Sequence, residues 1–291
     1  MSAEDFLIQR IDRERDYSRT ELSPDMAKAY EKATDVLSNP EYSIQEADFV
    51  GVYGPDIVAA DTARTDRLKH DFDARNTPEE KKMKQIADIF EAVVLMQSES
   101  SEWFGNARTL KTSAYDDYIN KVDMIAEWFS PEAGSRLLAL AVDVTFGLTN
   151  IQRKLEAIKE EIDENKLGSI KYFKDERGDF IGTRNNVPRI VIGVSEHVVE
   201  ELAELWVQGK KEALGKHPIQ RLFLDEIEVQ LTIMRDYALK KSKFDAVLAY
   251  DQVLGIVRPI RESKMKFRSR EVAGDPVAGK IVLNSRQVFR S

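Results

Sequence analysis

The stretch that most constrains the fold runs from position 114 to 162 and predicts two strands followed by a helix. The segments VDMIAEWF (122–129) and LLALAVDVTF (137–146) are rich in apolar and β-branched residues, and a turn containing Pro and Gly separates them. Apolar residues then recur at helical spacing from position 151 to 162. A hairpin that leads directly into an amphipathic helix indicates a protein in which helices pack on a sheet.

Each predicted strand carries one acidic residue inside its apolar run: Asp123 near the start of the first and Asp143 near the end of the second. Because side chains alternate across a strand, Asp143 shares a face with small residues, while the other face is large and apolar. In a hairpin the two acids come close together. An unpaired buried carboxylate is costly, so these acids need partners, protons or a metal ion.

Bonding within the protein is the simpler explanation for both acids. Asp123 can cap its strand by accepting hydrogen bonds from backbone amides. Asp143 can form a buried ion pair with Arg153 or Lys154, near the start of the following helix. At Asp143, an acid between small residues in mid-strand favours a ligand site over an ion pair.

The composition excludes several classes of metal site. The chain has 291 residues, of which 42% are hydrophobic and 32% charged, as expected for a globular protein of one large or two small domains. It has no cysteine and three widely separated histidines, which excludes disulfides and thiolate zinc sites and disfavours a histidine-rich site. Any bound metal is then a hard cation on carboxylates, Mg²⁺ or Mn²⁺.

The sequence also predicts a cytoplasmic protein without a membrane partner. No apolar run approaches the roughly 18 residues that cross a bilayer. The N-terminus, MSAEDFLIQR, lacks the basic-then-apolar order of a secretory signal. The absence of cysteine agrees with a reducing compartment.

The pattern along the chain predicts an α/β (α+β) protein in which a small mixed sheet is flanked by helices. Residues 1–76 are expected to form a helical N-terminal lobe, and residues 77–207 the α/β core. Residues 208–256 are expected to form C-terminal helices, and residues 257–291 a basic tail. Within the core the expected order is helix, short strand, two acid-bearing strands, helix, strand and helix.

A long helix is predicted to begin at Thr77-Pro78, with Thr as the N-cap and Pro at the first helical position. It ends near Gly105 and therefore directly precedes the acid-bearing hairpin. Glu91 and Glu99 lie on or beside the flank of its apolar stripe. Glutamates on helices are usually solvated, but this helix is well placed to lend the hairpin a carboxylate.

Positive charge is concentrated at the C-terminal end of the chain. Residues 257–291 include nine basic and three acidic residues, whereas the whole chain has a net charge of −8. Such a segment can contact phosphate groups, or it can be a solvated extension. The candidate contacts with nucleic acid are Arg261, Lys264, Lys266, Arg268 and Arg270.

The order of elements from position 77 to 207 resembles the core of the PD-(D/E)xK nuclease-like superfamily: a helix, a three-strand meander, a helix and a further strand. Val122-Asp123 matches its Pro-Asp element, and Asp143-Val144-Thr145 matches its acid-x-Lys element. Glu91 or Glu99 matches the glutamate of its first helix. The resemblance implies a metal-dependent nuclease, a hydrolase of phosphodiester bonds. It also implies Mg²⁺ or Mn²⁺ held by Asp123, Asp143 and Glu99, and catalytic roles for Glu91, Asp123 and Asp143.

One departure from the superfamily pattern concerns its lysine. Thr145 stands where the superfamily has a lysine that positions or activates the attacking water, and Thr carries no charge. Some members place this lysine on the following helix, and the resemblance then implies Lys154 as the catalytic lysine. If Lys154 does not reach the acids, the site is expected either to bind metal and cut poorly or to be a relic of an active site.

Three functions compete on the sequence alone. The first is the nuclease, with nucleic acid, and DNA before RNA, as its partner. The second is a non-catalytic binding or structural protein of the same fold that joins a larger assembly or a homo-oligomer, which the long charged helices suit. The third is a nucleotidyltransferase, which ranks last because the chain lacks its Gly-Ser pair and closely spaced Asp-x-Asp.

Overall fold

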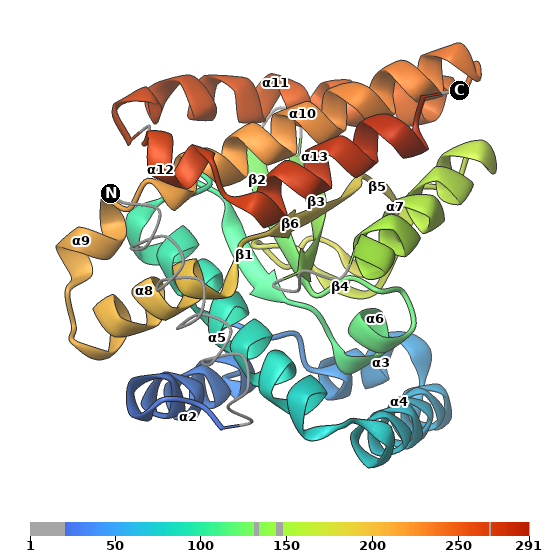
Figure 1. The fold of residues 1–291 in the computed structure, drawn as a ribbon. Coiled ribbons are helices and arrows are strands. Elements are labelled where there is room, and N and C mark those ends of the chain that lie inside the picture. The colour runs from blue at the N-terminus through green and yellow to red at the C-terminus, as the bar shows by residue number, and fades with distance from the viewer. Residues whose placement is uncertain (1–20, 131–133, 144–147, 268, 291) are drawn as a thin grey trace.

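The computed structural model of the chain describes residues 21–130, 134–143, 148–267 and 269–290. Figure 1 shows a small sheet at the centre of the molecule with helices around it. The predicted fold class, a small mixed sheet with flanking helices, is confirmed.

The described part of the N-terminal lobe, residues 21–76, is mainly helical and leads into α5, the longest helix of the predicted core. Ser23 caps α2 by accepting a hydrogen bond from Met26 N. Thr77 and Glu80 form a reciprocal capping box at the start of α5, which fixes where this helix begins. The elements are α2 (Pro24–Ser38), the 3₁₀ helix η1 (Glu46–Phe49), α3 (Val50–Tyr53), α4 (Pro55–Arg75) and α5 (Pro78–Ser101).

The α/β core contains the seven elements of the expected order and three more, α6, β4 and β5. β5 lacks an apolar pattern because most of its side chains are exposed. The elements are β1 (Arg108–Lys111), α6 (Ala114–Tyr118), β2 (Met124–Ser130), β3 (Gly134–Asp143), α7 (Leu148–Asp163), β4 (Gly168–Lys174), β5 (Ile181–Val187), β6 (Arg189–Gly193) and α8 (Glu196–Val207).

Four strands form one mixed sheet in the order β1-β2-β3-β6. β1, β2 and β3 form an antiparallel meander, and β6 pairs with β3 in parallel. The hairpin predicted for the two acid-bearing strands is therefore confirmed. Its register pairs Met124 with Leu140, so Asp123, at the entry to β2, lies beside the last residues of β3. β4 and β5 form a separate two-stranded sheet.

The two faces of the β2–β3 hairpin are buried in different clusters, as the alternation of its side chains predicts. Met124 and Leu138 belong to the main core, together with residues of α5, α8 and α10. Ile125 and Ala139 belong to a smaller cluster with residues of the β4–β5 hairpin, such as Phe173. The hairpin therefore lies between a helical layer and the small second sheet.

The C-terminal helices pack on the main core, and Figure 1 shows α10, α11 and α13 together at the top of the molecule. Gln230 on α10 hydrogen-bonds to both N and O of Val191, at 3.0 and 2.7 Å, and so covers the free edge of β6. The remaining elements are α9 (Lys211–Gly215), α10 (Ile219–Lys240), α11 (Phe244–Ser263), η2 (Met265–Phe267), α12 (Arg270–Ala273) and α13 (Pro276–Val288).

The basic C-terminal segment is part of the folded molecule. α13 contacts α7 and α10 and buries Val277 and Ile281. Asp275 caps this helix by accepting hydrogen bonds from the backbone N–H groups of Val277 and Ala278. Segment 257–288 is therefore not a solvated extension in the part of it that the structure describes. No helix within the described ranges has both the length and the apolar character needed to cross a membrane.

Candidate functional site

Four acidic side chains and one lysine meet where α5 passes the last residue of β1 and the first residue of β2. Lys111 Nζ lies 2.9 Å from a carboxylate oxygen of Glu91 and 3.5 Å from one of Asp117. The carboxyl group of Asp117 also hydrogen-bonds to that of Asp123. Asp88, one turn before Glu91 on α5, adds negative charge beside Glu91. We call these five residues the Lys111 cluster.

The position of Lys111 is fixed through the backbone of β1. Its N–H donates to Tyr42 O at 2.8 Å, and its C=O accepts from Ile44 N at 3.0 Å, so a segment of the N-terminal lobe pairs with β1. At the other end of β1, Thr109 N donates to a carboxylate oxygen of Glu99 at 2.6 Å. This bond joins β1 to α5, the helix that carries Glu91.

The loop before Asp123 is held by a buried arginine. Arg189, at the start of β6, donates to the backbone oxygens of Asn120 and Lys121 at 3.1 and 3.2 Å. Its guanidinium group also pairs with Glu161 on α7 at 2.7 Å. One side chain thus joins the last strand, the helix α7 and the entry to β2.

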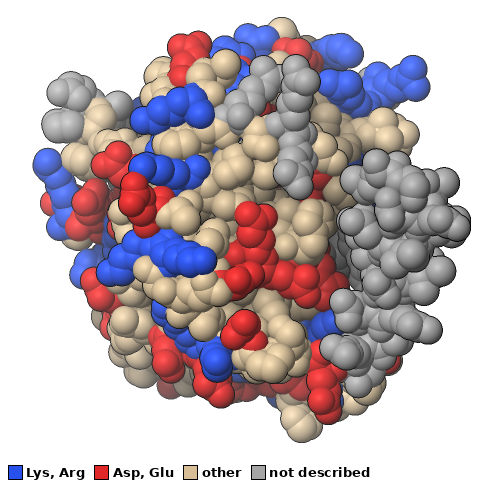
Figure 2. Space-filling view, turned by 60° about the vertical axis from the view of Figure 1, so that its left-hand side comes forward, with Lys and Arg blue, Asp and Glu red and all other residues tan. Residues whose placement is uncertain are grey.

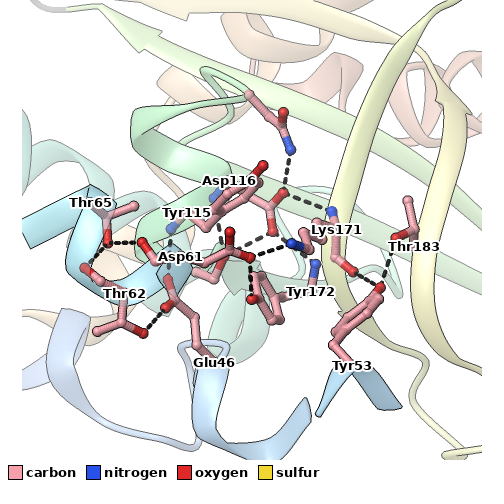
Figure 3. A network of polar contacts seen from close by, with 12 residues as sticks. Glu46, Tyr53, Asp61, Thr62, Thr65, Tyr115, Asp116, Lys171, Tyr172 and Thr183 are labelled. Atoms are coloured by element: carbon pink, nitrogen blue, oxygen red, sulfur yellow. Dashed lines mark hydrogen bonds and ion pairs between the residues drawn. The ribbon is translucent and has the colours of Figure 1, made fainter. Parts of the chain in front are cut away.

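Asp117 is positioned by its neighbour Asp116, which is fully buried. Successive residues of a helix point about 100° apart, so the two acids of α6 face different surroundings. Asp117 faces Lys111, whereas Asp116 faces the network in Figure 3. Asp116 accepts four hydrogen bonds, from the side chains of Ser113 and Asn120 and from the backbone N–H groups of Lys171 and Tyr172.

The N-terminal lobe closes this network, which we call the Lys171 network. Glu46 accepts a hydrogen bond from Tyr115 N at 2.8 Å, and Asp61 accepts from Tyr172 Oη at 2.6 Å and pairs with Lys171. Figure 3 shows these acids reaching from the lobe towards α6 and β4. Its members are Glu46, Tyr53, Asp61, Tyr115, Asp116, Lys171 and Tyr172.

Burial and mutual repulsion raise the pKa values of three acids of the Lys111 cluster, Asp88, Glu91 and Asp117. Burial raises the pKa of Glu91 to about 7, with Lys111 opposing the shift and Asp123 adding to it. Burial likewise raises the pKa of Asp117 to about 7 and that of Asp88 to about 6. Burial alone would lower the pKa of Lys111, but Glu91 and Asp117 outweigh it and hold that pKa above its usual range. The cluster therefore retains protons near neutral pH.

The structure brings together two of the predicted site residues, Glu91 and Asp123. Asp143 is the last residue of β3, two positions beyond the residue that the register places opposite Asp123. The side chain of Asp143 and the whole of Thr145 lie outside the described residues. Lys154 is half-buried in the first half of α7, and its approach to Asp143 stays a prediction.

Glu99, the alternative to Glu91, has a different environment. It is exposed, and its carboxylate accepts the hydrogen bond from Thr109 N. It lies eight residues beyond Glu91, or about 12 Å along the helix axis. The structure therefore places Glu91, and not Glu99, beside Asp123.

The residues predicted to contact nucleic acid differ in their surroundings. Arg261 Nε lies 2.5 Å from Asp225 and 2.9 Å from Glu228, so acids of α10 neutralise it. Burial lowers the pKa of Lys264, whereas Lys266 is exposed. The side chains of Arg268 and Arg270 lie outside the described residues.

One face of the molecule is shown in Figure 2. In its coloured parts acidic and basic side chains are interspersed, and acidic ones gather near the middle. These parts therefore offer no continuous basic surface to a polyanion.

Three members of the Lys111 cluster are not predicted from the sequence as site residues: Asp88, Lys111 and Asp117. Asp117 gives a signal, because it is an acid in the approach to Asp123. Asp88 is three residues before Glu91, which places it on the same side of a helix. Lys111 gives no signal in the sequence, because only the strand register shows that its side chain lies beside α5 and α6.

A metal ion was expected in this region. Among the described residues, no group of three or more acidic or histidine side chains is arranged to hold one. The four carboxyl groups of the Lys111 cluster are oxygen donors of the kind that a hard divalent cation prefers. Lys111 supplies the positive charge between Glu91 and Asp117.

Comparisons with family models, with curated proteins and with solved structures found no match to this chain. Its function therefore has to be inferred from the site itself.

Proposed function

We propose that the chain is a metal-dependent phosphodiesterase of the PD-(D/E)xK type, a nuclease or nuclease-like protein that acts on nucleic acid. The observation that carries this proposal is the convergence of Glu91, Asp117 and Asp123 around Lys111. These acids come from a helix, a short connecting helix and the entry to a strand. Burial raises the pKa values of Glu91 and Asp117, and perturbed pKa values are common at functional sites.

The arrangement of elements supports the same proposal. A helix (α5), a three-strand meander (β1, β2 and β3), a helix (α7) and a strand (β6) occur in this order along the chain, with α6 inside the meander and β4 and β5 before β6. Asp123 at the start of β2 and Asp143 at the end of β3 lie at one end of the sheet, beside the helix that carries Glu91. This is the order of elements that the superfamily uses to bring its acids together.

In this proposal Glu91, Asp123 and Asp143 hold Mg²⁺ or Mn²⁺. Such an ion, when bound, activates water and neutralises the phosphate. Lys111 remains charged at neutral pH and would pair with a phosphate oxygen as negative charge develops there. Asp117, with a pKa near 7, suits the transfer of a proton to or from water.

A second candidate is a non-catalytic binding or structural protein that uses the same fold. One observation favours it: Lys111 already neutralises part of the acid charge at a distance of 2.9 Å from Glu91. A lysine bound in this way competes with a metal ion for the carboxylates. Arg258 and Arg261 are likewise paired with acids of α10 and so are not free for phosphate groups.

A thermal melt with and without Mg²⁺ or Mn²⁺ separates the two candidates. A bound ion stabilises the folded state by mass action, so millimolar metal is expected to raise Tm by several degrees. Asp123→Asn should abolish this shift. Glu99→Gln, which removes an acid of the same helix outside the cluster, should keep it. Equal melting curves with and without both metals would favour the binding protein.

Cleavage of labelled DNA and RNA oligonucleotides tests the chemistry, and two lysine variants test which lysine serves it. Lys111→Ala and Lys154→Ala should each be compared with wild type in the presence of metal. In the proposal, the variant that lacks the catalytic lysine loses cleavage but still binds metal. Asp143→Ala should lose both cleavage and metal binding. A wild-type protein that binds metal and cuts no nucleic acid would contradict the nuclease and leave a metal-binding protein.

A further inference from the structure

A polar cavity opens far from the Lys111 cluster. It has a volume of about 290 Å³ and lies between the start of β3, the end of β5 and the first half of α11. Figure 1 shows α11 at the top of the molecule and α6 in its lower half, so the cavity and the Lys111 cluster are at different ends. The residues that line it include Arg136, Arg184, Asn185, Asn186, Leu248 and Gln252.

Arg184 lines this cavity and is held by two aromatic rings. Its guanidinium group lies 3.9 Å from the centre of the Phe180 ring and also near Phe173, which holds it in place by cation–π contacts. Its Nε is buried and has no hydrogen-bond partner. No ion pair joins it to the residues that the structure describes, whereas the well-buried Arg189 and Arg221 both have carboxylate partners.

The rest of the lining suits a ligand that is both anionic and rich in hydrogen-bonding groups. Asn185, Asn186 and Gln252 present side-chain amides, each of which can donate and accept. Asp245 is the one acid among the described lining residues, and it accepts a hydrogen bond from Asn165 at 3.3 Å. Leu248, 59% exposed, adds an apolar surface at the same cavity.

We propose that this cavity binds a nucleotide, with its phosphate on Arg184 and its base against the amides and Leu248. A guanidinium group held flat matches phosphate oxygens bidentately. A volume of 290 Å³ lies just below the range of small-ligand sites, roughly 300–1,000 Å³, and suits one nucleotide. The proposal does not depend on the nuclease activity, because the cavity shares no residue with the Lys111 cluster.

Calorimetric titration of the full chain with the 5′-monophosphates of adenosine, guanosine, cytidine and uridine tests this site. At least one nucleotide should bind, and the corresponding nucleoside and inorganic phosphate should each bind more weakly. Succinate serves as a dicarboxylate probe. If it binds as tightly as the best nucleotide, the site is a carboxylate site and the proposal fails. It also fails if none of the nucleotides binds at millimolar concentration.

Substitutions at Arg184 test whether this residue binds the nucleotide. Arg184→Gln should weaken nucleotide binding about tenfold or more, because it removes a charged hydrogen-bonding partner. Arg177→Gln is the matched control, since Arg177 also lies over an aromatic ring, that of Phe129 at 4.3 Å, but does not line the cavity. If Arg184→Gln does not fold, Arg184→Lys replaces it and should still weaken binding. Equal affinities for wild type and the Arg184 variant would overturn the proposal.

Discussion

The Lys111 cluster and the Lys171 network are built around lysines of equal exposure, yet they balance charge in opposite ways. The side chains of Lys111 and Lys171 are both 20% exposed. Lys171 pairs with one carboxylate, that of Asp61, and its Nζ lies 4.7–5.4 Å from the ring centres of three tyrosines. Lys111 faces Glu91 and Asp117 directly, with two further acids nearby.

Asp116 and Asp117, adjacent on α6, show what this difference means. Asp116 accepts four hydrogen bonds at 2.6–3.0 Å, two of them from backbone N–H groups. Asp117 shares one lysine with Glu91 and hydrogen-bonds to another acid. A carboxylate with enough donors stabilises a fold, whereas carboxylates that outnumber their donors retain protons or attract a cation. The Lys171 network is thus the support, whereas the Lys111 cluster holds the surplus of acids on which the proposed function rests.

The largest expected effect is the loss of Asp116. Asp116→Ala leaves two backbone N–H groups and two side chains without their acceptor in a buried place. Since each buried unsatisfied group costs about 1–3 kcal/mol, we expect a loss of about 4 kcal/mol in the free energy of unfolding. Urea denaturation measures it, and Asp48→Ala, which removes an exposed acid of the N-terminal lobe, is the control. A loss below about 1 kcal/mol would show that the Lys171 network is not a support.

Removal of Lys111 should have the next largest effect, and this effect should depend on pH. In Lys111→Met the buried acids lose their cation, and the removal of one partner of a buried pair costs about 3 kcal/mol. At pH 5 Asp88, Glu91 and Asp117 hold protons, so the loss should shrink. Urea denaturation at pH 5 and 8 tests this, with the exposed Lys174→Met as the control. An equal loss at both pH values would mean that the acids are not protonated as inferred.

The fold of this chain could be predicted in large part because its signals are local. Ser23 and Thr77 cap helices as their sequences indicate, and the apolar runs around Asp123 and Asp143 pair as a hairpin. Such signals depend on neighbours a few residues apart. β5 was missed because its side chains are mostly exposed, so burial leaves no pattern in its sequence.

The site could be predicted only in part, because its members meet through register and packing. Glu91 and Asp123 were within reach of the sequence, since both lie in apolar surroundings next to the hairpin. Lys111 was not, because the side of β1 on which it lies depends on the pairing of that strand with β2. Whether Glu91 or Glu99 lies beside Asp123 depends on how far α5 extends past the sheet. No short-range sequence pattern predicts that distance.

A smaller effect, of opposite sign, is expected for Asp117→Asn. The pKa of Asp117 rises from its ordinary 3.8 to about 7 on folding, so between these values the folded state binds more protons than the unfolded state. The stability that this group contributes is therefore full below about pH 4 and is lost as the pH rises to about 7. Asparagine has no charge to repel, so the variant should be about 1 kcal/mol more stable than wild type at pH 8.

Melting curves of this variant and wild type from pH 4 to pH 8 provide the measurement. The difference in Tm should grow in favour of Asp117→Asn as the pH rises. A difference that favours wild type at pH 8 would mean that Asp117 is a satisfied partner of Lys111, like the acids of the Lys171 network.

The smallest effect is expected for Glu99→Gln, and it sharpens the distinction between the two glutamates of α5. Glu99 accepts one hydrogen bond, from Thr109 N, and a glutamine oxygen can accept the same bond without the charge. We expect a loss of about 0.5 kcal/mol that does not change between pH 5 and 8. Glu91→Gln, in contrast, should raise stability at pH 8 by relieving the repulsion with Asp123 and Asp88. If both variants lose stability equally at pH 8, Glu91 is a structural partner of Lys111. The acids of the Lys111 cluster would then not repel one another in the way that a bound cation would relieve.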